Sequence, residues 1–495
     1  MIRRGLYQLE LAAAAAMLIG VGLVSLLAGL GMANSQATSG PVAERTQTVQ
    51  VGSSQTVSIP PKDEIHYIGL SAGSCATANC HGGVRATDQA GDEWKTSAFV
   101  FLQTDPHAQA FDVLFDERSQ KIVSRLAQWE AISAGKQQKD PADGDTQWYT
   151  SQLQAKCVSC HATPVAAGTA DNTDALLTHY SLGVTCEACH GPASHWGNQH
   201  LSSTWKTTQP TKSALDKQSW GFNELENPSI AAATCTKCHI GDGSQVDGKS
   251  RREVTHDLIA AGHPRLDFDF AAWYGAMPPH WNRAREKVSG FHTEAWLAGQ
   301  TQNLQTRGRL STNQLINPEF ANFDCFACHQ ALRFPPRATS YPANPLTSGS
   351  SWKVFTTLYG DGRKQNKELT TTPVELCRSL SAFPGQDKEI GSFDELASWY
   401  YAADAVSRDA MFAAVSAPAL EQPAKIADAS LRELKSAMEK YLAPAGEVSR
   451  YASPAGFGVK PRAGNEEEPE KAEAVQTAFE EARAAMKSLA DAWRP

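Results

Sequence analysis

The chain has 495 residues, enough for two or three domains of ordinary size. Hydrophobic residues make up 41% of it and charged residues 20%, a balance typical of a globular protein and not of a disordered one. The formal net charge is -8. Because no basic cluster is dense enough to neutralise a phosphate backbone, the composition argues against nucleic acid as a partner.

The N-terminus has the pattern of an export signal or a membrane anchor. Arg3 and Arg4 precede an apolar run over residues 11–33, and about 20 apolar residues can cross a bilayer. The arginines would stay in the cytoplasm, so the rest of the chain would lie on the periplasmic side of the membrane. The length of the run favours an uncleaved anchor, although small residues after it also allow cleavage as a signal peptide, and a buried core helix is the third interpretation. We expect residues 1–37 to be this signal or anchor and residues 38–63 to be a flexible tether.

The cysteines are spaced for haem attachment. Export would permit disulfides, but four motifs read C-x-x-C-H, the signature of a c-type haem site. In such a site each thiol forms a thioether with one haem vinyl group, and the adjacent histidine ligates the iron. Zinc is the main alternative, but zinc ribbons do not need a histidine directly after each cysteine pair. The four motifs contain Cys157, Cys160 and His161; Cys186, Cys189 and His190; Cys235, Cys238 and His239; and Cys325, Cys328 and His329.

A fifth haem site is expected at "CATANCH", where Cys75 and Cys80 precede His81 with two extra residues between the cysteines. The longer spacer can bulge outward and still leave both sulfurs near the vinyl groups; a disulfide or two free thiols are the alternatives. Of the 11 cysteines, only Cys377 then has no haem, and we interpret it as a small buried hydrophobic residue. The sequence thus predicts five covalent haem c groups, each with its attachment histidine on a short helix.

The second ligands of these irons should be histidines. Nine of the 14 histidines lie outside the attachment motifs, all of them between residues 66 and 292. Met277 is the only methionine in the haem-bearing part of the chain. Bis-histidine ligation should therefore dominate, and because methionine ligation raises the reduction potential, mostly low potentials are expected. One iron with an open sixth position is the alternative, and it would be a catalytic site.

Three stretches resemble a known family. They are "HYIGLSAGSCATANCHGG" with "EWKTSAF" and "DPHAQAF" after it; "GVTCEACHGPASHWGNQH"; and "THDLIAAGHPRLDFDF" with "MPPHW" and "FDCFACH". Together they are similar to the tetrahaem cytochrome c family of ammonia-oxidising bacteria and its larger multihaem relatives, the hydroxylamine oxidoreductase-like superfamily. The resemblance covers residues 64–335.

The resemblance implies particular iron ligands. In the first stretch it implies His107, in company with Trp94. After the Gly-Pro of the second stretch it implies either His195 or His200, of which His195 is favoured. The remaining implied ligands are His256, His263 and His280. Three histidines have no counterpart, and for at least two of them we expect a surface or packing role: His66, His179 and His292.

The fold class expected from these features is mainly α. Residues 64–335 should form a pentahaem cytochrome c domain of short helices and loops wrapped around the haems, residues 336–351 a linker, and residues 352–495 a helical C-terminal domain. Capping boxes at residues 392–395 and 430–433 and an acidic start near residue 466 predict three helices in the last domain. Their apolar stripes favour core packing over a docking surface for a partner.

Two functions fit these predictions. The first is a membrane-anchored, exported electron carrier whose partners are other cytochromes or a quinol-linked donor. The second is a multihaem redox enzyme in which one open-site haem acts on a small nitrogen or sulfur compound.

Overall fold

The structure, a computed structural model, is described for part of the chain. The described residues are 47–51, 55–59, 65, 67–68, 75–83, 93–135, 146–164, 179–202, 205, 217–246, 250–263, 268–313, 319, 321, 371–383, 393–442 and 469–493. None of the helices in these ranges has the length and apolar character needed to cross a bilayer. The apolar run at 11–33, His66, the first residue of the capping box, Ser392, and the attachment motif of Cys325, Cys328 and His329 fall outside these ranges.

The chain divides into two compact units, Met1–Ile59 and Pro60–Pro495. In the first unit, strands β1 (Gln47–Val51) and β2 (Gln55–Ile59) form an antiparallel hairpin in which Val49 pairs with Val57. This hairpin lies in the segment expected to be a flexible tether. The sequences QTVQV and QTVSI alternate polar and β-branched residues, which is the period of a strand.

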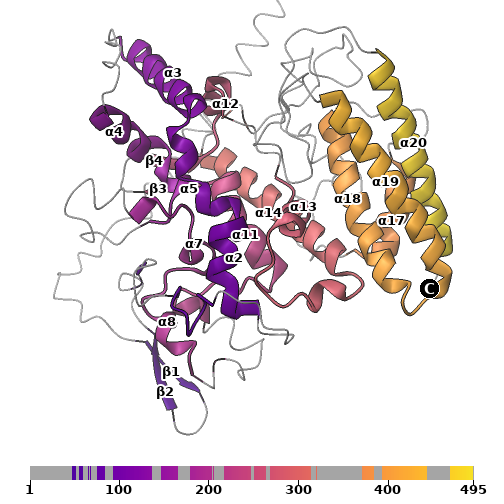
Figure 1. Ribbon diagram of the computed structural model, residues 1–495, viewed down its shortest axis with the longest axis horizontal. Coiled ribbons are helices and arrows are strands. Elements are labelled where there is room, and N and C mark those ends of the chain that lie inside the picture. Colours follow the sequence, from indigo (N-terminus) through magenta and orange to yellow (C-terminus); the bar gives the residue numbers. More distant parts are fainter. Residues whose placement is uncertain are drawn as a thin grey trace, which may run out of the picture. The chain divides into compact units, whose positions relative to one another are not determined.

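The second unit is mainly α, as expected. Its haem-bearing part consists of short helices, short 3-10 turns and one small sheet of β3 and β4, joined by loops (Figure 1). The elements are η2 (Glu93–Thr96), α2 (Ser97–Thr104), η3 (Pro106–Gln109), η4 (Asp112–Phe115), α3 (Glu117–Ser133), α4 (Thr146–Lys156), α5 (Val158–His161), α7 (Cys186–His190), α8 (Trp196–Gln199), α11 (Pro228–His239), β3 (Gly241–Val246), β4 (Ser250–Glu253), α12 (His256–Ala261), α13 (Phe270–Ala276), η5 (Arg285–Lys287) and α14 (Phe291–Asn313).

The apolar side chains of the haem-bearing part form small, separate clusters. One cluster is built around Phe111, Leu153 and Tyr180, and a second is built around Phe268 and Leu310. Neither cluster runs through the whole region. The macrocycles predicted from the sequence would complete this apolar interior, because short helices and loops bury little apolar surface by themselves.

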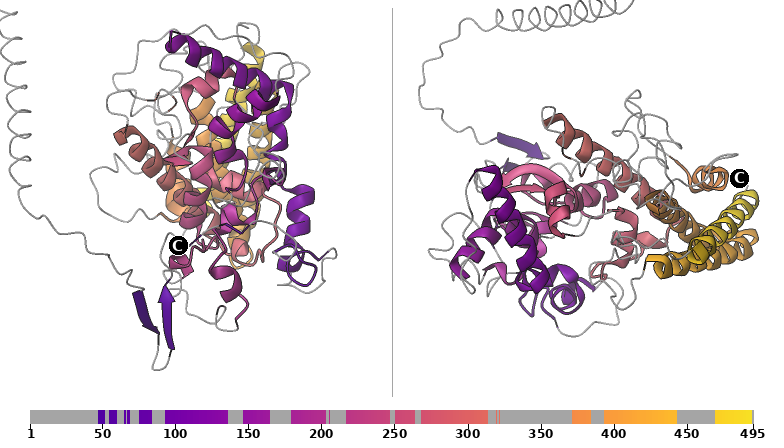
Figure 2. Two further views of the ribbon diagram at one scale, coloured as in Figure 1. Left: turned by 90° about the vertical axis from the view of Figure 1, so that its left-hand side faces the viewer. Right: turned by 90° about the horizontal axis from the view of Figure 1, so that it is seen from above.

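The C-terminal part is a set of longer helices with one continuous core. Helices α18, α19 and α20 lie side by side, and α17 packs against α18 and α20 (Figure 2). The predicted apolar stripes are confirmed as core: Leu431, Leu434 and Met438 from α19 and Val475 from α20 are at most 2% exposed. The bounds are α17 (Pro373–Ala382), α18 (Phe393–Ala413), η10 (Pro418–Leu420), α19 (Glu421–Leu442) and α20 (Pro469–Ala492).

In the C-terminal part, one sequence prediction is wrong and another is confirmed. Helix α19 begins at Glu421, directly after η10, so Ser430 lies inside the helix and does not cap it. Cys377 is fully buried in the core, where its thiol donates to the carbonyl oxygen of Met486 at 3.2 Å. Its prediction as a small buried hydrophobic residue is confirmed.

Helix α14 connects the two parts. Its Trp296 belongs to the core of the C-terminal helices. Asp409 of α18 accepts hydrogen bonds from the backbone N–H groups of His292 and Thr293, at 3.1 and 2.8 Å, so it caps the start of α14. Further along, α14 packs against α11, which ends in an attachment motif.

Candidate haem centres

Three of the four described attachment motifs lie on short helices, as predicted. Helix α7 is the motif CEACH itself, α5 ends at His161, and α11 ends at His239. The motif cysteines of the described residues are free thiols, which gives no support to the disulfide alternative in this part of the chain. A helical turn brings a cysteine at i, a cysteine at i+3 and a histidine at i+4 to one side of the backbone.

The motif with the longer spacer is a series of turns. The N–H of Cys80 bonds the carbonyl of Thr77 at 2.9 Å, and the N–H of His81 bonds the carbonyl of Cys75 at 3.1 Å. The spacer therefore folds back and returns His81 to a position beside Cys75. Gly82 lets the chain pass close to this bulge, because a Cβ at that residue would lie 2.0 Å from the carbonyl oxygen of Ala76.

Each of the four described attachment histidines faces a second histidine from a remote part of the chain. We call these four contacts the ring pairs. Their ring centres are 6.1–6.4 Å apart. The ring pairs are His81–His200, His190–His280, His239–His107 and His161–His263.

This separation fits an iron atom between two imidazoles. A ligating imidazole nitrogen lies about 2 Å from its metal, so two rings on opposite sides of one metal ion have their centres about 6 Å apart. Other ring contacts near these sites range from 4.6 Å for His239 and Trp273 to 6.5 Å for His200 and Trp205, so the separation is compatible with an iron and does not by itself require one. The chemistry of the donors also fits, because each ring pair includes the histidine of an attachment motif.

Hydrogen bonds at Nδ1 orient several of these rings. A carbonyl or carboxylate oxygen can only accept, so the ring nitrogen facing it must be the donor, and Nε2 is left with a lone pair for a metal. Four rings donate Nδ1–H to backbone carbonyls: His81 to Trp94 at 2.9 Å, His161 to Ala110 at 2.7 Å, His280 to Pro278 at 3.3 Å, and His200 to Gly197.

His107 has a different partner. Its Nδ1 donates to the carboxylate of Asp105 at 2.9 Å, and the same carboxylate accepts the backbone N–H of His107 at 2.9 Å. Burial lowers the pKa of His107, but the hydrogen bond and charge of Asp105 outweigh this effect and raise it. A carboxylate behind a ligating histidine increases the basicity of the ring. The sequence analysis missed Asp105, although Asp-Pro-His is the N-cap pattern that starts η3.

Burial keeps the attachment histidines neutral. It lowers the pKa of His190 to about 4 and that of His239 to about 3, with further lowering from neighbouring histidines, and it also lowers the pKa of His81 and His161. A histidine must be neutral at Nε2 to bind a metal. Aromatic side chains line these sites: Phe268 stacks on His239 at 4.9 Å and Phe222 on His190 at 6.1 Å.

Charge interactions between neighbouring groups indicate an order for the ring pairs, and we call the series in this order the row. The histidines whose charges affect His190 are His280 and His81, so the first two ring pairs are neighbours. Those that affect His239 are His107, His161 and His263, so the last two ring pairs are neighbours as well. The charges of Cys235 and Cys238 in the third motif affect Cys189 in the second motif, so the second and third ring pairs are neighbours too. The order along the row is His81–His200, His190–His280, His239–His107, His161–His263.

The structure brings His200, and not the favoured His195, to His81. His195 is the residue before the single turn of α8 and His200 is the residue after it. Trp196 anchors the turn, because its indole N–H donates to the carbonyl of Gly191 at 3.2 Å and its ring contacts that of His200 at 5.6 Å. The side of the turn that carries His200 therefore faces the first motif.

The other histidines have separate surroundings. His256 starts α12, and its backbone N–H donates to Glu319 at 2.6 Å. His292 is 9% exposed and stacks on Phe412 of α18 at 5.8 Å, so it has a packing role. His179 directly precedes the buried Tyr180 and is partly exposed.

A family model described as cytochrome c554 and c-prime matches residues 75–191. The match begins at Cys75 and so includes the motif with the longer spacer. No curated protein and no solved structure matches the chain. This match supports the interpretation of the haem-bearing part as that of a multihaem c-type cytochrome, a class of protein that binds haem c covalently and takes part in electron transfer.

Proposed function

We propose that the chain is an exported, membrane-anchored electron carrier with five covalent haem c groups, most of them ligated by two histidines. The four ring pairs carry this proposal: each joins an attachment histidine to a remote histidine at the spacing that one iron needs. When bound, haems in a row pass electrons from one to the next without moving parts.

The residues of the chain have distinct roles in this proposal. The cysteines of each motif fix the macrocycle, and the histidine after them takes one side of the iron. His107, His200, His263 and His280 would be the second ligands of four irons, which would leave no position open to a substrate at these four. Nδ1 donors such as that of His161 hold the rings in one orientation, and the buried surroundings keep water away from the iron.

For the fifth centre, with Cys325, Cys328 and His329, we propose His256 as the second ligand. Two observations support this choice. The backbone of His256 is bonded to Glu319, which lies six residues before Cys325 in the sequence. His107, His200, His263 and His280 are already committed to other ring pairs, and His292 is packed against Phe412. His195 remains the second candidate from the sequence.

The proposed place of the protein is the periplasmic side of the cytoplasmic membrane. The support is Arg3 and Arg4 before the apolar run at 11–33. Redox proteins, either other cytochromes or a quinol-linked donor, are its proposed partners. We also propose a relationship to the hydroxylamine oxidoreductase-like superfamily. This relationship is wider than the family match over residues 75–191.

Two measurements test the carrier proposal. The intact mass of the matured protein should show five haem additions, and four would remove either the Cys75–Cys80 site or the site at Cys325. Electron paramagnetic resonance (EPR) of the oxidised protein should show only low-spin iron. A high-spin signal from one iron in five, together with turnover of hydroxylamine, nitrite, nitric oxide or sulfite, would instead establish the enzyme function.

A further inference from the structure

A buried carboxylate lies beside the first half of the row. Glu187, inside the motif CEACH, is 1% exposed, and its Oε1 accepts the backbone N–H groups of Ile68 at 2.9 Å and Ala193 at 2.8 Å. Burial and the charge of Glu187 together raise the pKa of the Cys75 thiol, and its charge also acts on Cys186. Glu187 is therefore close to the attachment points of both the His81 and the His190 centres.

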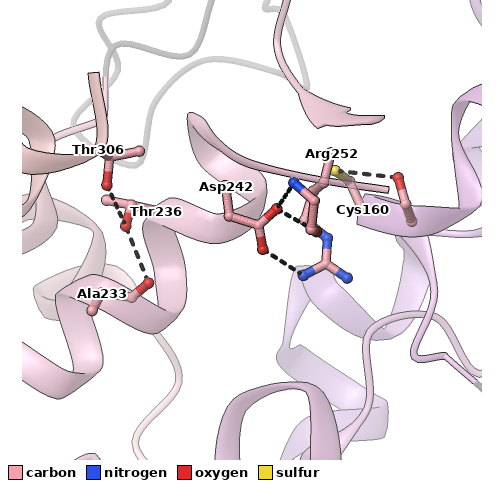
Figure 3. A network of polar contacts seen from close by, with 8 residues as sticks. Cys160, Ala233, Thr236, Asp242, Arg252 and Thr306 are labelled. Carbon is pink, nitrogen blue, oxygen red and sulfur yellow. Dashed lines mark hydrogen bonds and ion pairs between the residues drawn. The ribbon is translucent and has the colours of Figure 1, made fainter. Parts of the chain in front are cut away.

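A mostly buried arginine lies beside the second half of the row. Arg252 of β4 is 14% exposed and pairs with Asp242 at 3.3 Å, while its Nε has no hydrogen-bond partner within the described residues (Figure 3). Strand β4 contacts both α5 and α11, the helices that end at His161 and His239, and the charge of Arg252 acts on Cys160 and Cys238. Arg252 is therefore close to the attachment points of the His161 and His239 centres.

Two more arginines hold the segment that carries His263. Arg118 of α3 donates from Nε and Nη2 to the carbonyl of Gly262, at 3.0 and 2.6 Å, and Arg125 donates to the carbonyl of Ala261 at 2.9 Å. Gly262 ends α12 in the left-handed region, with a φ of 118°, and His263 follows it directly. The last ring pair thus has arginines near both of its histidines.

Other charges also lie near the row, and several of them are paired. Lys95 lies 5.6 Å from the centre of the Trp94 ring, which contacts His81, and Glu253, next to Arg252, is 7% exposed. Asp242 offsets part of the charge of Arg252 and also accepts the N–H of Ser244 at 2.8 Å. Lys217, over the rings of Trp205 and Phe222, is paired with Glu224 at 3.1 Å. Asp105 lies behind His107 and also acts on Cys189, so it is at the junction of the two halves. The ends of the row therefore differ in sign: anionic at Glu187 and cationic at the three arginines.

We propose that these charges grade the reduction potentials along the row, so that an electron rests preferentially on the haem of the His161–His263 pair and least on that of the His81–His200 pair. Reduction adds a negative charge, which a nearby cation stabilises and a nearby anion opposes, most strongly where water is excluded. Electrons would then enter at the Glu187 end and leave at the arginine end. This inference rests on the proposed carrier function and gives it a direction.

The ring planes provide a way to follow one haem by itself. In the His81–His200 pair the planes are 24° apart, whereas in the other three ring pairs they are 72–88° apart. Near-parallel imidazoles give a rhombic low-spin EPR signal, and near-perpendicular ones give a strongly anisotropic signal with a large principal g value. An EPR-monitored redox titration of the full protein should therefore separate the first haem from the other three described centres.

The expected result is that the rhombic species has the lowest midpoint potential of these four haems. Glu187→Gln should raise its electron affinity about tenfold, which is about 59 mV for one electron, and leave the other species closer to their original potentials. Arg252→Gln and Arg125→Gln should each lower the electron affinity of an anisotropic species by a similar factor without moving the rhombic one. Asp242→Asn, which removes the offsetting anion, should shift an anisotropic species in the opposite direction to Arg252→Gln.

The control is Arg432→Gln, since Arg432 is 68% exposed and paired with Asp428 on α19, away from the row. It should move no potential. The charge proposal is overturned if the rhombic species is the most easily reduced of the four, or if Arg252→Gln and Asp242→Asn shift potentials in the same direction. Failure of the carrier proposal looks different, because the rhombic and anisotropic low-spin signals would then be absent from the unsubstituted protein. Arg125→Gln provides an independent test should Arg252→Gln fail to fold.

Discussion

The two parts of the second unit are stabilised in different ways. The C-terminal helices share one apolar core in which Leu396, Val406 and Leu434 are fully buried. The haem-bearing part has only small clusters and many partly exposed motif residues. Side chains alone can hold the first part together, whereas the second depends on groups that its cysteines and histidines bind.

The largest expected effect comes from withholding haem from the full chain. Without haem, residues 75–263 should lose protection against amide hydrogen exchange, because their ring pairs have nothing to hold them together. Residues 393–442 and 469–492 should keep theirs, since their core is made of side chains. Hydrogen exchange with mass spectrometry on the haem-free and matured chains measures this directly. Equal loss of protection in both parts would contradict the contrast.

The second prediction concerns one ring pair. His200→Ala should leave the iron bound by His81 without its second ligand, so the rhombic EPR signal should be replaced by a high-spin one and the reduced protein should bind carbon monoxide at one haem. The matched control is His195→Ala, because His195 lies at the other end of α8, and this variant should keep the rhombic signal. The reverse result would assign the first iron to His195.

The third prediction concerns the C-terminal core. Leu434 is fully buried, so Leu434→Ala should lower the free energy of unfolding of the C-terminal helices by about 2–5 kcal/mol. The Soret spectrum should not change. Denaturant unfolding followed by circular dichroism provides the measurement, with Ile426→Ala as control because Ile426, on the same helix, is 45% exposed and should cost below about 0.5 kcal/mol. A perturbed haem spectrum in the Leu434→Ala protein would mean that the two parts are not independently stabilised.

The smallest effect is expected at the start of α17. The hydroxyl of Thr372 accepts the N–H of Glu375 at 3.2 Å, and Glu375 accepts the N–H of Thr372 at 2.9 Å, so Thr372→Ala should cost about 1 kcal/mol. The backbone hydrogen bond from Thr372 holds the pKa of Glu375 below its usual value of 4.5. The contribution of Glu375 is therefore present above pH 4.5 and is lost as the pH falls below it. The stabilities of the unsubstituted protein and of Glu375→Ala, measured from pH 6 to pH 3, should therefore converge; a constant difference would contradict this.

Sequence reasoning worked where the signal is local. Three of the four described C-x-x-C-H and related motifs have their histidine on a short helix, as predicted, and the apolar stripes of α19 and α20 predicted the C-terminal core. One capping prediction was wrong. Ser430 has the pattern of a helix cap, yet helix α19 already begins at Glu421, so Ser430 lies inside it. The hairpin at residues 47–59 was missed because polar composition was weighed above the alternation of valines.

The pairing of histidines was beyond local reasoning. His81 meets His200 and His161 meets His263 only because the folded chain brings remote segments together, and no spacing rule records that. Which of His195 and His200 reaches His81 depends on the orientation of the single turn of α8, and the contact of Trp196 with Gly191 fixes that orientation. The charges of Glu187 and Arg252 were equally invisible, since their importance comes from their neighbours in space.

Helix α14 has a consequence for how this chain can be shortened. Its Trp296 lies in the C-terminal core, and Asp409 caps its first turn. On its other side, Gln300 bonds Asp269 and Asn303 bonds the carbonyl of Phe268. Thr306 bonds Thr236 in the haem-bearing part (Figure 3). A chain cut between residues 336 and 351 would leave a buried tryptophan facing water and the helix start uncapped. The C-terminal helices thus support α14, which in turn packs against the third attachment motif. The chain should therefore be expressed without truncation.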